Sequence, residues 1–324
     1  LRQANLLRQI YSNQQLYEMM VEFWTDHFNI SVEKGDCWYL KVVDDREVIR
    51  AHALGNFADL LQASARSPAM LVYLDNQANL PEAPNENYAR EVLELHTLGV
   101  DGGYQQVDIG ELARSLTGWT VRDHFWRGRF HFDEELHDQG PKRILDMELP
   151  ASGMHEVLDF LERIALHPAT ARHLAIKLVR RFISDDPIGD ASWLVERTEK
   201  AFLESGGDIR TTLRPVLLDG LVRDSGMLGM KFKRPVDFLV SALRLSGAET
   251  DGGLPLHQYL GRMGQAPFAW PTPEGPPDIA SHWQANLTPR WNFALRLSSG
   301  SIAGTTLPDH DRRSFGGAGS IHTL

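Results

Sequence analysis

The sequence predicts a mostly α-helical fold, a multi-helix orthogonal bundle with a small β-hairpin or irregular insertion near 119–149. Apolar residues recur at helical spacing through most of the chain, which is the main sequence signal of amphipathic helices. Partial alternation of apolar and polar residues, the signal of strands, is confined to 119–149. The 324 residues, of which 42% are hydrophobic, suffice for a large buried core.

The first helical pattern begins at Leu16, where apolar residues follow the i, i+3, i+4, i+7 spacing of a buried stripe. Its members are Leu16, Met19, Met20, Phe23, Trp24, His27 and Phe28. We expect further helices at 44–54, 57–65 and 68–74. Pro68 begins the last of these, because proline is well tolerated in the first turn of a helix.

A helix with many polar residues is predicted at 85–98, with Gly99 as its C-cap, and another at 107–116, which Gly118 ends. Later helices are expected at 154–166, 168–183, 191–204, 208–221 and 235–245, followed by a long Pro-rich loop over 264–289. We interpret residues 1–297 as a single helical domain, with a candidate subdivision near residue 150. Residues 298–324 are rich in Gly and Ser, so we expect a flexible tail there.

The composition excludes several classes of protein. The net charge of −10 argues against broad binding to nucleic acid or to anionic membranes, which requires basic patches. Cys37 is the only cysteine, which excludes an intrachain disulfide and a cysteine metal cluster. Since the sequence has no run of 18 apolar residues, we expect no transmembrane segment. The chain begins without Met and without a signal-peptide pattern, as expected of a processed or truncated product.

The helix predicted at 85–98 carries the main candidate site. With 100° per residue, Asn87, Arg90, Glu91, Glu94 and Thr97 share one face, and His96 falls on the apolar face. One interpretation is a solvated face with an Arg90–Glu94 pair. The other is an active site, because two neighbouring carboxylates raise one pKa, as a general acid at neutral pH requires.

Two further histidines extend this candidate site. His27 lies inside an apolar stripe, where it is either a core residue or a partner of the 85–98 helix. His137 and Asp138 begin a predicted loop that ends at Lys142. The predicted catalytic residues are therefore Glu91, Glu94, His27 and His137, and the predicted ligand-binding residues are Asn85, Asn87, Arg90, Asp138, Lys142 and Trp119.

No known metal motif is present, and the cofactor stays unknown. There is no His-Glu-x-x-His, and Glu94 and His96 lie about 200° apart around the helix axis, so they cannot chelate one ion. A divalent metal held by His27, Glu91, Glu94 and His137 is an open alternative. The chain also lacks a G-x-S-x-G elbow and a phosphate-binding loop.

Eight segments resemble the bacterial family known as domain of unknown function 1800. They are FWTDHF at 23–28, ALGNFADLL at 53–61, SPAMLVYLDN at 67–76, PNENYAREVLELHTLGVDGGY at 84–104, ARSLTGW at 113–119, HDQGPK at 137–142, HPATARHLAIKLVRRFI at 167–183 and MGQAPFAWPTPEG at 263–275. Where members of that family often have Trp-His-Asn-His-Phe, this chain keeps His27 but has Thr25 in place of the first His. The family usually has further helices before this start.

The resemblance implies a mostly helical, exported or periplasmic bacterial protein with a sulfatase-like partner, but no established reaction. From the site residues we expect an enzyme, a hydrolase or lyase on envelope or extracellular carbohydrate, in which Glu91 and Glu94 act as acid and base. Two alternatives stay open: a metal-dependent enzyme using His27 with Glu91 and Glu94, and a non-catalytic binding or assembly protein.

Overall fold

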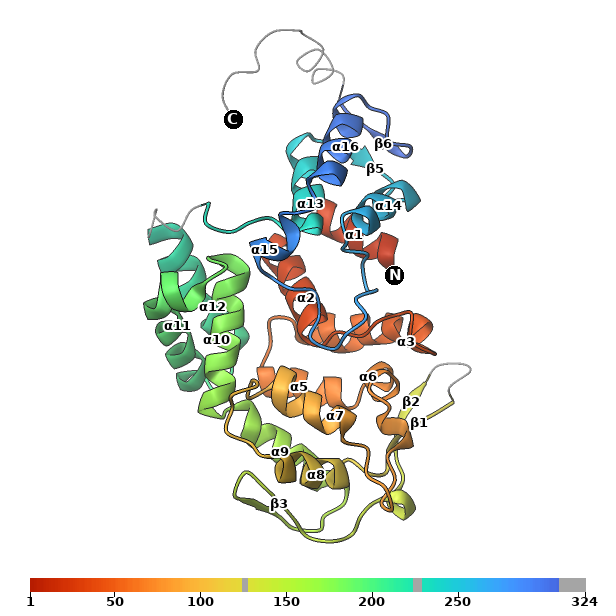
Figure 1. The fold of residues 1–324 in the computed structure, drawn as a ribbon, viewed down its shortest axis with the longest axis vertical. Coiled ribbons are helices and arrows are strands. Elements are labelled where there is room, and N and C mark those ends of the chain that lie inside the picture. Colours follow the sequence, from red (N-terminus) through yellow and green to blue (C-terminus); the bar gives the residue numbers. More distant parts are fainter. Residues whose placement is uncertain (124–127, 224–228, 309–324) are drawn as a thin grey trace. The chain divides into compact units, whose positions relative to one another are not determined.

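The computed structural model describes residues 1–123, 128–223 and 229–308, which form two compact units (Figure 1). Unit 1 consists of Leu1–Met19, Phe232–Pro267 and the chain from Asp278 onward, and unit 2 consists of Met20–Lys231 and Phe268–Pro277. No division falls near residue 150, which lies inside unit 2. The range 1–297 includes parts of both units, and its folding as a single domain stays a prediction.

The mostly α-helical fold is confirmed. The helices of unit 2 are α2 (Gln15–His27, divided between the units after Met19), α3 (Cys37–Val43), α4 (Arg50–His52), α5 (Phe57–Ala65), α6 (Pro68–Tyr73), α7 (Glu86–Glu91), α8 (Gln106–Ser115), α9 (Met154–Ala165), α10 (Pro168–Phe182), α11 (Pro187–Glu204) and α12 (Ile209–Arg214). Those of unit 1 are α1 (Arg2–Tyr11), α13 (Pro235–Leu245), α14 (Leu254–Arg262), α15 (Ala280–Trp283) and α16 (Leu287–Ser298).

Wider π-helical turns follow three of these helices directly, at Asp44–Ile49, Val92–His96 and Pro215–Arg223, and short 3-10 helices occur at Asn76–Ala78 and Glu134–Leu136. A π-helix closes its hydrogen bonds five residues apart and occurs often at functional sites. The helix expected at 85–98 is therefore α7 followed by a π turn, so the 100° spacing holds only for its first part.

Small antiparallel hairpins confirm the insertion predicted near 119–149. β1 (Trp119–Arg122) pairs with β2 (Arg129–Phe132), with Trp119 opposite Phe132, and β3 (Lys142–Ile144) pairs with β4 (Met147–Leu149). In unit 1, β5 (Glu249–Thr250) pairs with β6 (Thr305–Thr306).

Several helices begin where the sequence supplies a cap. Asn56 accepts a hydrogen bond from the N–H of Ala58 at 2.8 Å at the start of α5, and the imidazole of His167 accepts one from Ala169 at the start of α10. Pro68 and Pro168 occupy the first turns of α6 and α10. The helices predicted at 57–65 and 235–245 have these same bounds.

Other elements differ from the prediction. The helix expected at 44–54 is reached through α3, and α1 and α14 were not expected. The region 264–289 is not one loop, because it contains α15 and the start of α16, where Pro289 fits within the first turn. The first part of the predicted tail is packed: Ile302 and Leu307 are buried in the core of unit 1, and β6 is paired. Residues 309–324 lie outside the described residues.

Aromatic side chains fill the centre of unit 2. Trp24 of α2 is 1% exposed, donates its indole N–H to the carbonyl of Ala53 at 3.0 Å and packs against Phe57, which also contacts Phe202. α10 and α11 lie side by side in Figure 1. This packing brings α2 and α10 to the π turn Val92–His96, which follows α7. In the part of the chain that the structure describes, no helix is both long and apolar enough to cross a membrane.

Candidate functional site

The two asparagines at the start of α7 form hydrogen bonds with backbone groups through their side chains. Asn85 is the N-cap, and its side-chain oxygen accepts a hydrogen bond from the N–H of Asn87 at 3.0 Å. Asn87 donates its side-chain amide to the carbonyl of Leu74 at 3.2 Å. Both residues, predicted to bind a ligand, therefore help to fix the position at which α7 begins.

Arg90 joins the carboxylates on the polar face of α7. Its guanidinium lies 3.2 Å from Glu86 and 3.4 Å from Glu94, and it donates to the side-chain oxygen of Gln106 on α8 at 3.0 Å. The predicted Arg90–Glu94 pair is thus present. Because Arg90 is 37% exposed, the pair is partly solvated, and each carboxylate beside it gains a nearby positive charge.

Glu91 has a different environment from Glu94. Its half-buried carboxyl group makes no hydrogen bond or ion pair with any residue that the structure describes. The pKa of Glu91 is raised to about 7, mainly by partial burial and also by repulsion from Glu94 and Glu274, while Arg90 opposes the increase. At neutral pH this carboxyl group exchanges between protonated and ionised states, as a general acid or base must.

A segment distant in the sequence borders this carboxyl group. We call Phe268–Pro277 the strap, and it belongs to unit 2. The N–H of Val32 donates to the carbonyl of the first strap residue at 2.8 Å. The side-chain amide of Asn29 donates to the carbonyls of Trp270 at 3.1 Å and Thr272 at 2.7 Å. The chain following α2 thus holds the strap through its backbone.

Tyr73 at the end of α6 connects the strap with Glu91. Its hydroxyl donates to the carbonyl of Pro271 at 2.9 Å. Burial is the main cause that raises the pKa of Tyr73 to about 12, and the negative charges of Glu274 and Glu91 contribute to the increase. Asn29 also hydrogen-bonds to the Tyr73 side chain and opposes that increase. The three side chains of Glu91, Tyr73 and Glu274 therefore form one electrostatically coupled group.

His27 lies in the core and has no hydrogen bond or ion pair with Glu91 or Glu94. The residue is 1% exposed, and its Nε2 donates to the backbone carbonyl of His96 at 3.1 Å. Burial first, and then the positive charge of Lys177, holds the pKa of His27 well below 6.5. His27 thus reaches the end of the segment predicted as the 85–98 helix, at the carbonyl and ring of His96 rather than at a carboxylate.

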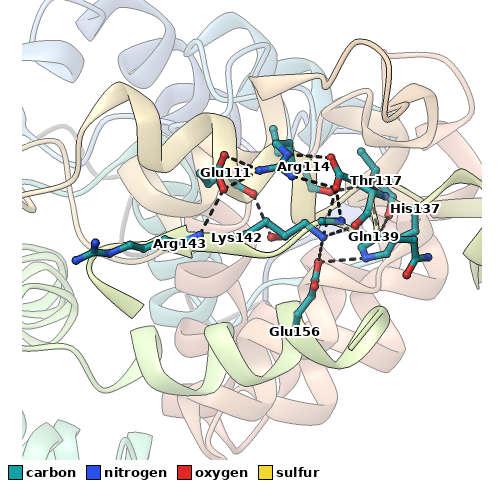
Figure 2. A network of polar contacts seen from close by, with 12 residues as sticks. Glu111, Arg114, Thr117, His137, Gln139, Lys142, Arg143 and Glu156 are labelled. Atoms are coloured by element: carbon teal, nitrogen blue, oxygen red, sulfur yellow. Dashed lines mark hydrogen bonds and ion pairs between the residues drawn. The ribbon is translucent and has the colours of Figure 1, made fainter. Parts of the chain in front are cut away.

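His137 and Lys142 belong to a second, buried cluster, drawn in Figure 2. The Lys142 ammonium lies 2.7 Å from Oε1 of Glu156 on α9, and Nε2 of His137 lies 3.1 Å from the same oxygen. These three side chains are at most 1% exposed. The opposite ring nitrogen of His137 donates to the carbonyl of Thr117 at 2.8 Å.

Arg114 of α8 extends this cluster toward Asp138. It donates from Nε and Nη2 to both carboxylate oxygens of Asp138, at 2.8 and 3.1 Å, and from Nη1 to both oxygens of Glu111, at 2.8 and 2.9 Å (Figure 2). The hydrogen bonds from Arg114 hold the pKa of Asp138 below its usual value. His137, Asp138 and Lys142 are therefore brought together, in a network that joins α8, β3 and α9.

The two clusters are distinct sites. Gln106 in the first turn of α8 contacts Arg90, and Arg114 in its last turn contacts Asp138, which places the contacts about 12 Å apart along the helix. Trp119 belongs to neither cluster, because it is fully buried and packs its ring edge-on against Phe130.

The family model described as "Protein of unknown function (DUF1800)" matches residues 1–320. The chain belongs to this family. No curated protein and no solved structure matches it. The chemistry of this DUF1800 protein must therefore be argued from its own side chains.

Three of the segments on which the resemblance to the DUF1800 family rests supply Glu91, Tyr73 and Glu274. The segment 67–76 supplies Tyr73, the segment 84–104 supplies Glu91, and the segment 263–275 supplies Glu274. Asn29, which follows the shared segment 23–28, holds the strap. Sequence reasoning missed Asn29, Tyr73 and Glu274, and membership of these segments was the one signal that could have found the last two.

The second hypothesis for this DUF1800 protein, a metal-dependent enzyme, needs a set of ligands that the described residues do not provide. Within residues 1–123, 128–223 and 229–308, no group of three or more His, Cys, Asp or Glu side chains is placed so that it could hold a metal ion. The Nε2 of His27 is hydrogen-bonded to a carbonyl, and His137 lies in the second cluster. The four residues of the proposed mononuclear site are thus divided among different places.

Proposed function

We propose that the chain is an exported enzyme, a hydrolase or lyase that acts on envelope or extracellular carbohydrate, with Glu91 as its general acid or base. The observation that carries this proposal is the pKa of Glu91, raised to about 7 by partial burial and by neighbouring carboxylates. Perturbed carboxyl groups of this kind gather at catalytic sites, although structural clusters also perturb pKa values.

Glu91 at the end of α7 and Glu94 in the π turn that follows it suit different roles. Glu94 forms an ion pair with Arg90 at 3.4 Å, whereas Glu91 forms no ion pair with a described residue and has a pKa raised to about 7. Titratable groups whose environments separate their pKa values are the usual pattern of an acid and a base in one site. Glu91 would exchange the proton with the substrate, and Glu94 would stabilise positive charge that develops nearby.

The groups around Glu91 favour a substrate rich in hydroxyl groups. Carboxylate oxygens accept hydrogen bonds from hydroxyls, and the half-buried carboxyl group of Glu91 has no hydrogen-bond partner among the described residues. The strap adds the charge of Glu274, and the strap also carries the half-buried Trp270; apolar faces with a few placed polar groups are typical of small-molecule sites. Sugars present such hydroxyls together with an apolar face.

The test is an activity assay on purified protein with bacterial cell-wall and exopolysaccharide preparations. Hydrolysis is followed by new reducing ends, and elimination is followed by the ultraviolet absorbance of the unsaturated product. We expect Glu91→Gln to lower kcat by about 100-fold or more. The matched control is Glu82→Gln, which removes an exposed carboxylate outside the Glu91 group and leaves kcat unchanged.

The pH dependence of kcat/KM distinguishes the two roles of Glu91. If Glu91 is a general acid, it is active while protonated, so kcat/KM falls above pH 7. If Glu91 is a general base, it is active while ionised, so kcat/KM falls below pH 7. Equal activity of Glu91→Gln and the unchanged protein would overturn the proposal.

A non-catalytic binding or assembly protein is the second candidate function. Trp38 and Val42, one turn apart on α3, are 68% and 42% exposed, and exposed apolar side chains of this size favour a binding surface. The sulfatase-like partner expected from the family resemblance belongs to this proposal. Co-purification of such a partner, lost in Trp38→Ser and kept in Glu91→Gln, would favour it over the enzyme.

A further inference from the structure

The π-helical turn Val92–His96, which carries Glu94 and directly follows Glu91, is held by three side chains. Thr97 donates its hydroxyl to the carbonyl of Val92 at 2.6 Å. His173 of α10 donates Nε2–H to the carbonyl of Leu95 at 3.2 Å, and His27 of α2 donates Nε2–H to the carbonyl of His96 at 3.1 Å. The last carbonyls of a helix have no partner within the helix, so the two histidines satisfy the carbonyls of Leu95 and His96, which would otherwise lack one there.

We propose that His27 and His173 are positioning residues that clamp this turn and thereby set the environment of the Glu91 carboxyl group. The inference rests on the proposed function, because it assigns these histidines a role in maintaining the acid or base. It differs from the catalytic role predicted for His27, since neither ring makes a hydrogen bond or ion pair with Glu91 or Glu94 in the part of the chain that is described.

The chemical state of both rings suits a clamp. A carbonyl oxygen only accepts, so each ring must carry its proton on Nε2, which fixes the tautomer. Burial, together with the positive charge of Lys177, lowers the pKa of both rings, to about 3 for His173. Both side chains therefore stay neutral donors through the physiological pH range.

Gly99 shows that the chain leaving the turn is shaped to admit His173. Its φ of +82° lies in the region that favours glycine, and a Cβ atom there would lie 2.9 Å from Nδ1 of His173. A larger residue would push the ring away from the carbonyl of Leu95. The hydrogen bond from His173 to the carbonyl of Leu95 therefore depends on the His173 ring and on the lack of a side chain at Gly99.

The register of the turn determines where Glu94 lies relative to Glu91 and Arg90. π-helical turns are rare and persist where surrounding contacts hold them. If the turn relaxed to α-helical geometry, the residues after Glu91 would rotate about the axis. Glu94 would change its distance from both Arg90 and Glu91, and the repulsion that raises the pKa of Glu91 would change with it.

The experiment measures the titration of Glu91 without any substrate. The full chain is labelled with carbon-13 at the glutamate carboxyl carbons, and the Glu91 resonance is identified by its loss in Glu91→Gln. We expect a midpoint near pH 7 in the unchanged protein, shifted toward 4.5 by about one unit in His27→Leu and in His173→Leu. His27→Gln and His173→Gln, whose amide N–H can replace Nε2–H, keep the original midpoint.

His52→Leu is the matched control. It removes a ring hydrogen bond, to the carbonyl of Val48 at 2.9 Å, from a different π-helical turn, and it leaves the Glu91 midpoint unchanged. If the leucine variants do not fold, Gly99→Ala displaces His173 while keeping its ring, and we expect the same downward shift.

Folded variants that keep the midpoint of the unchanged protein would overturn the clamp. A shift in the glutamine variants as large as that in the leucine variants would also overturn it, because packing rather than the hydrogen bond would be responsible. A midpoint near 4.5 in the unchanged protein would instead remove the basis of the proposed function, so the two failures are distinguishable.

Discussion

Glu91 and Glu94 lie three residues apart on one helical segment, and only Glu94 has a cation beside it. The guanidinium of Arg90 is 3.4 Å from Glu94, whereas burial and the charge of Glu94 raise the pKa of Glu91 to about 7. Two carboxylates of the same chemical type thus lie in different environments, and the titration of Glu91 can be measured before any substrate is known.

The stability of the fold should change with pH through Glu91. Its pKa is raised in the folded chain above the unfolded value of 4.5, so its favourable contribution is complete below pH 4.5 and is lost as pH rises through 7. Glu91→Gln should therefore be neutral at pH 4.5 and stabilise the protein by about 2 kcal/mol at pH 8, with allowance for partial exposure. Urea unfolding at both pH values measures this, and a destabilised variant at pH 8 would contradict it.

The strap should influence Glu91 through the charge of Glu274. Removing that charge in Glu274→Gln reduces the repulsion on Glu91, so the midpoint of Glu91 should fall by a few tenths of a unit. Gly275→Ala should have a similar effect by displacing the strap, because Gly275 has φ +73° and a Cβ there would lie 2.2 Å from the carbonyl of Asp26. Carboxyl titration by carbon-13 NMR measures both, with Glu82→Gln as the control that leaves the midpoint in place.

Helix positions were largely predictable, because their signals are local. Asn56 and Pro68 mark helix starts in the sequence, and the helices at those points begin as predicted. The π turn at Val92–His96 was not predictable from a 100° spacing, so Thr97, placed on the polar face by that spacing, is fully buried in the structure. A hydrogen bond to the carbonyl of Val92 explains its burial.

The candidate site was predictable only in part. Arg90, Glu91 and Glu94 are neighbours on one helix, so periodicity placed them together. Tyr73 and Glu274 come from segments roughly two hundred residues apart, and only tertiary packing brings them to Glu91. Spacing along the chain carries no information about such contacts.

The buried cluster on α9 should contribute strongly to stability. Glu156→Leu removes the carboxylate nearest to the fully buried Lys142 ammonium and leaves Asp138 at 4.0 Å, and loss of one partner of a buried pair costs about 3–5 kcal/mol. The control is Asp146→Ala, which breaks a pair with Arg143 whose side chains are 92% and 65% exposed, and costs about 1 kcal/mol or less. Thermal unfolding of the two variants compares them, and equal melting temperatures would contradict a structural role of the cluster.

His96 should make the fold sensitive to acid. The residue is 1% exposed, and neither ring nitrogen has a hydrogen-bond partner in the part of the chain that the structure describes. Burial, with repulsion from Lys177, lowers the pKa of His96 to about 3, below the unfolded value of 6.5. Its favourable contribution is therefore complete above pH 6.5 and is lost progressively as pH falls toward 3.

His96→Leu should remove the loss of stability at low pH, and it also removes an unpaired polar ring from the core. We expect the free energy of unfolding of the variant to exceed that of the unchanged protein by about 1 kcal/mol at pH 7.5. At pH 5 we expect this difference to be larger by about 2 kcal/mol. Urea unfolding at these two pH values is the measurement, and His155→Leu, which removes an exposed imidazole, is the control. A variant that is less stable at both pH values would show that the His96 ring makes a favourable interaction within unit 2, and the prediction would then be wrong.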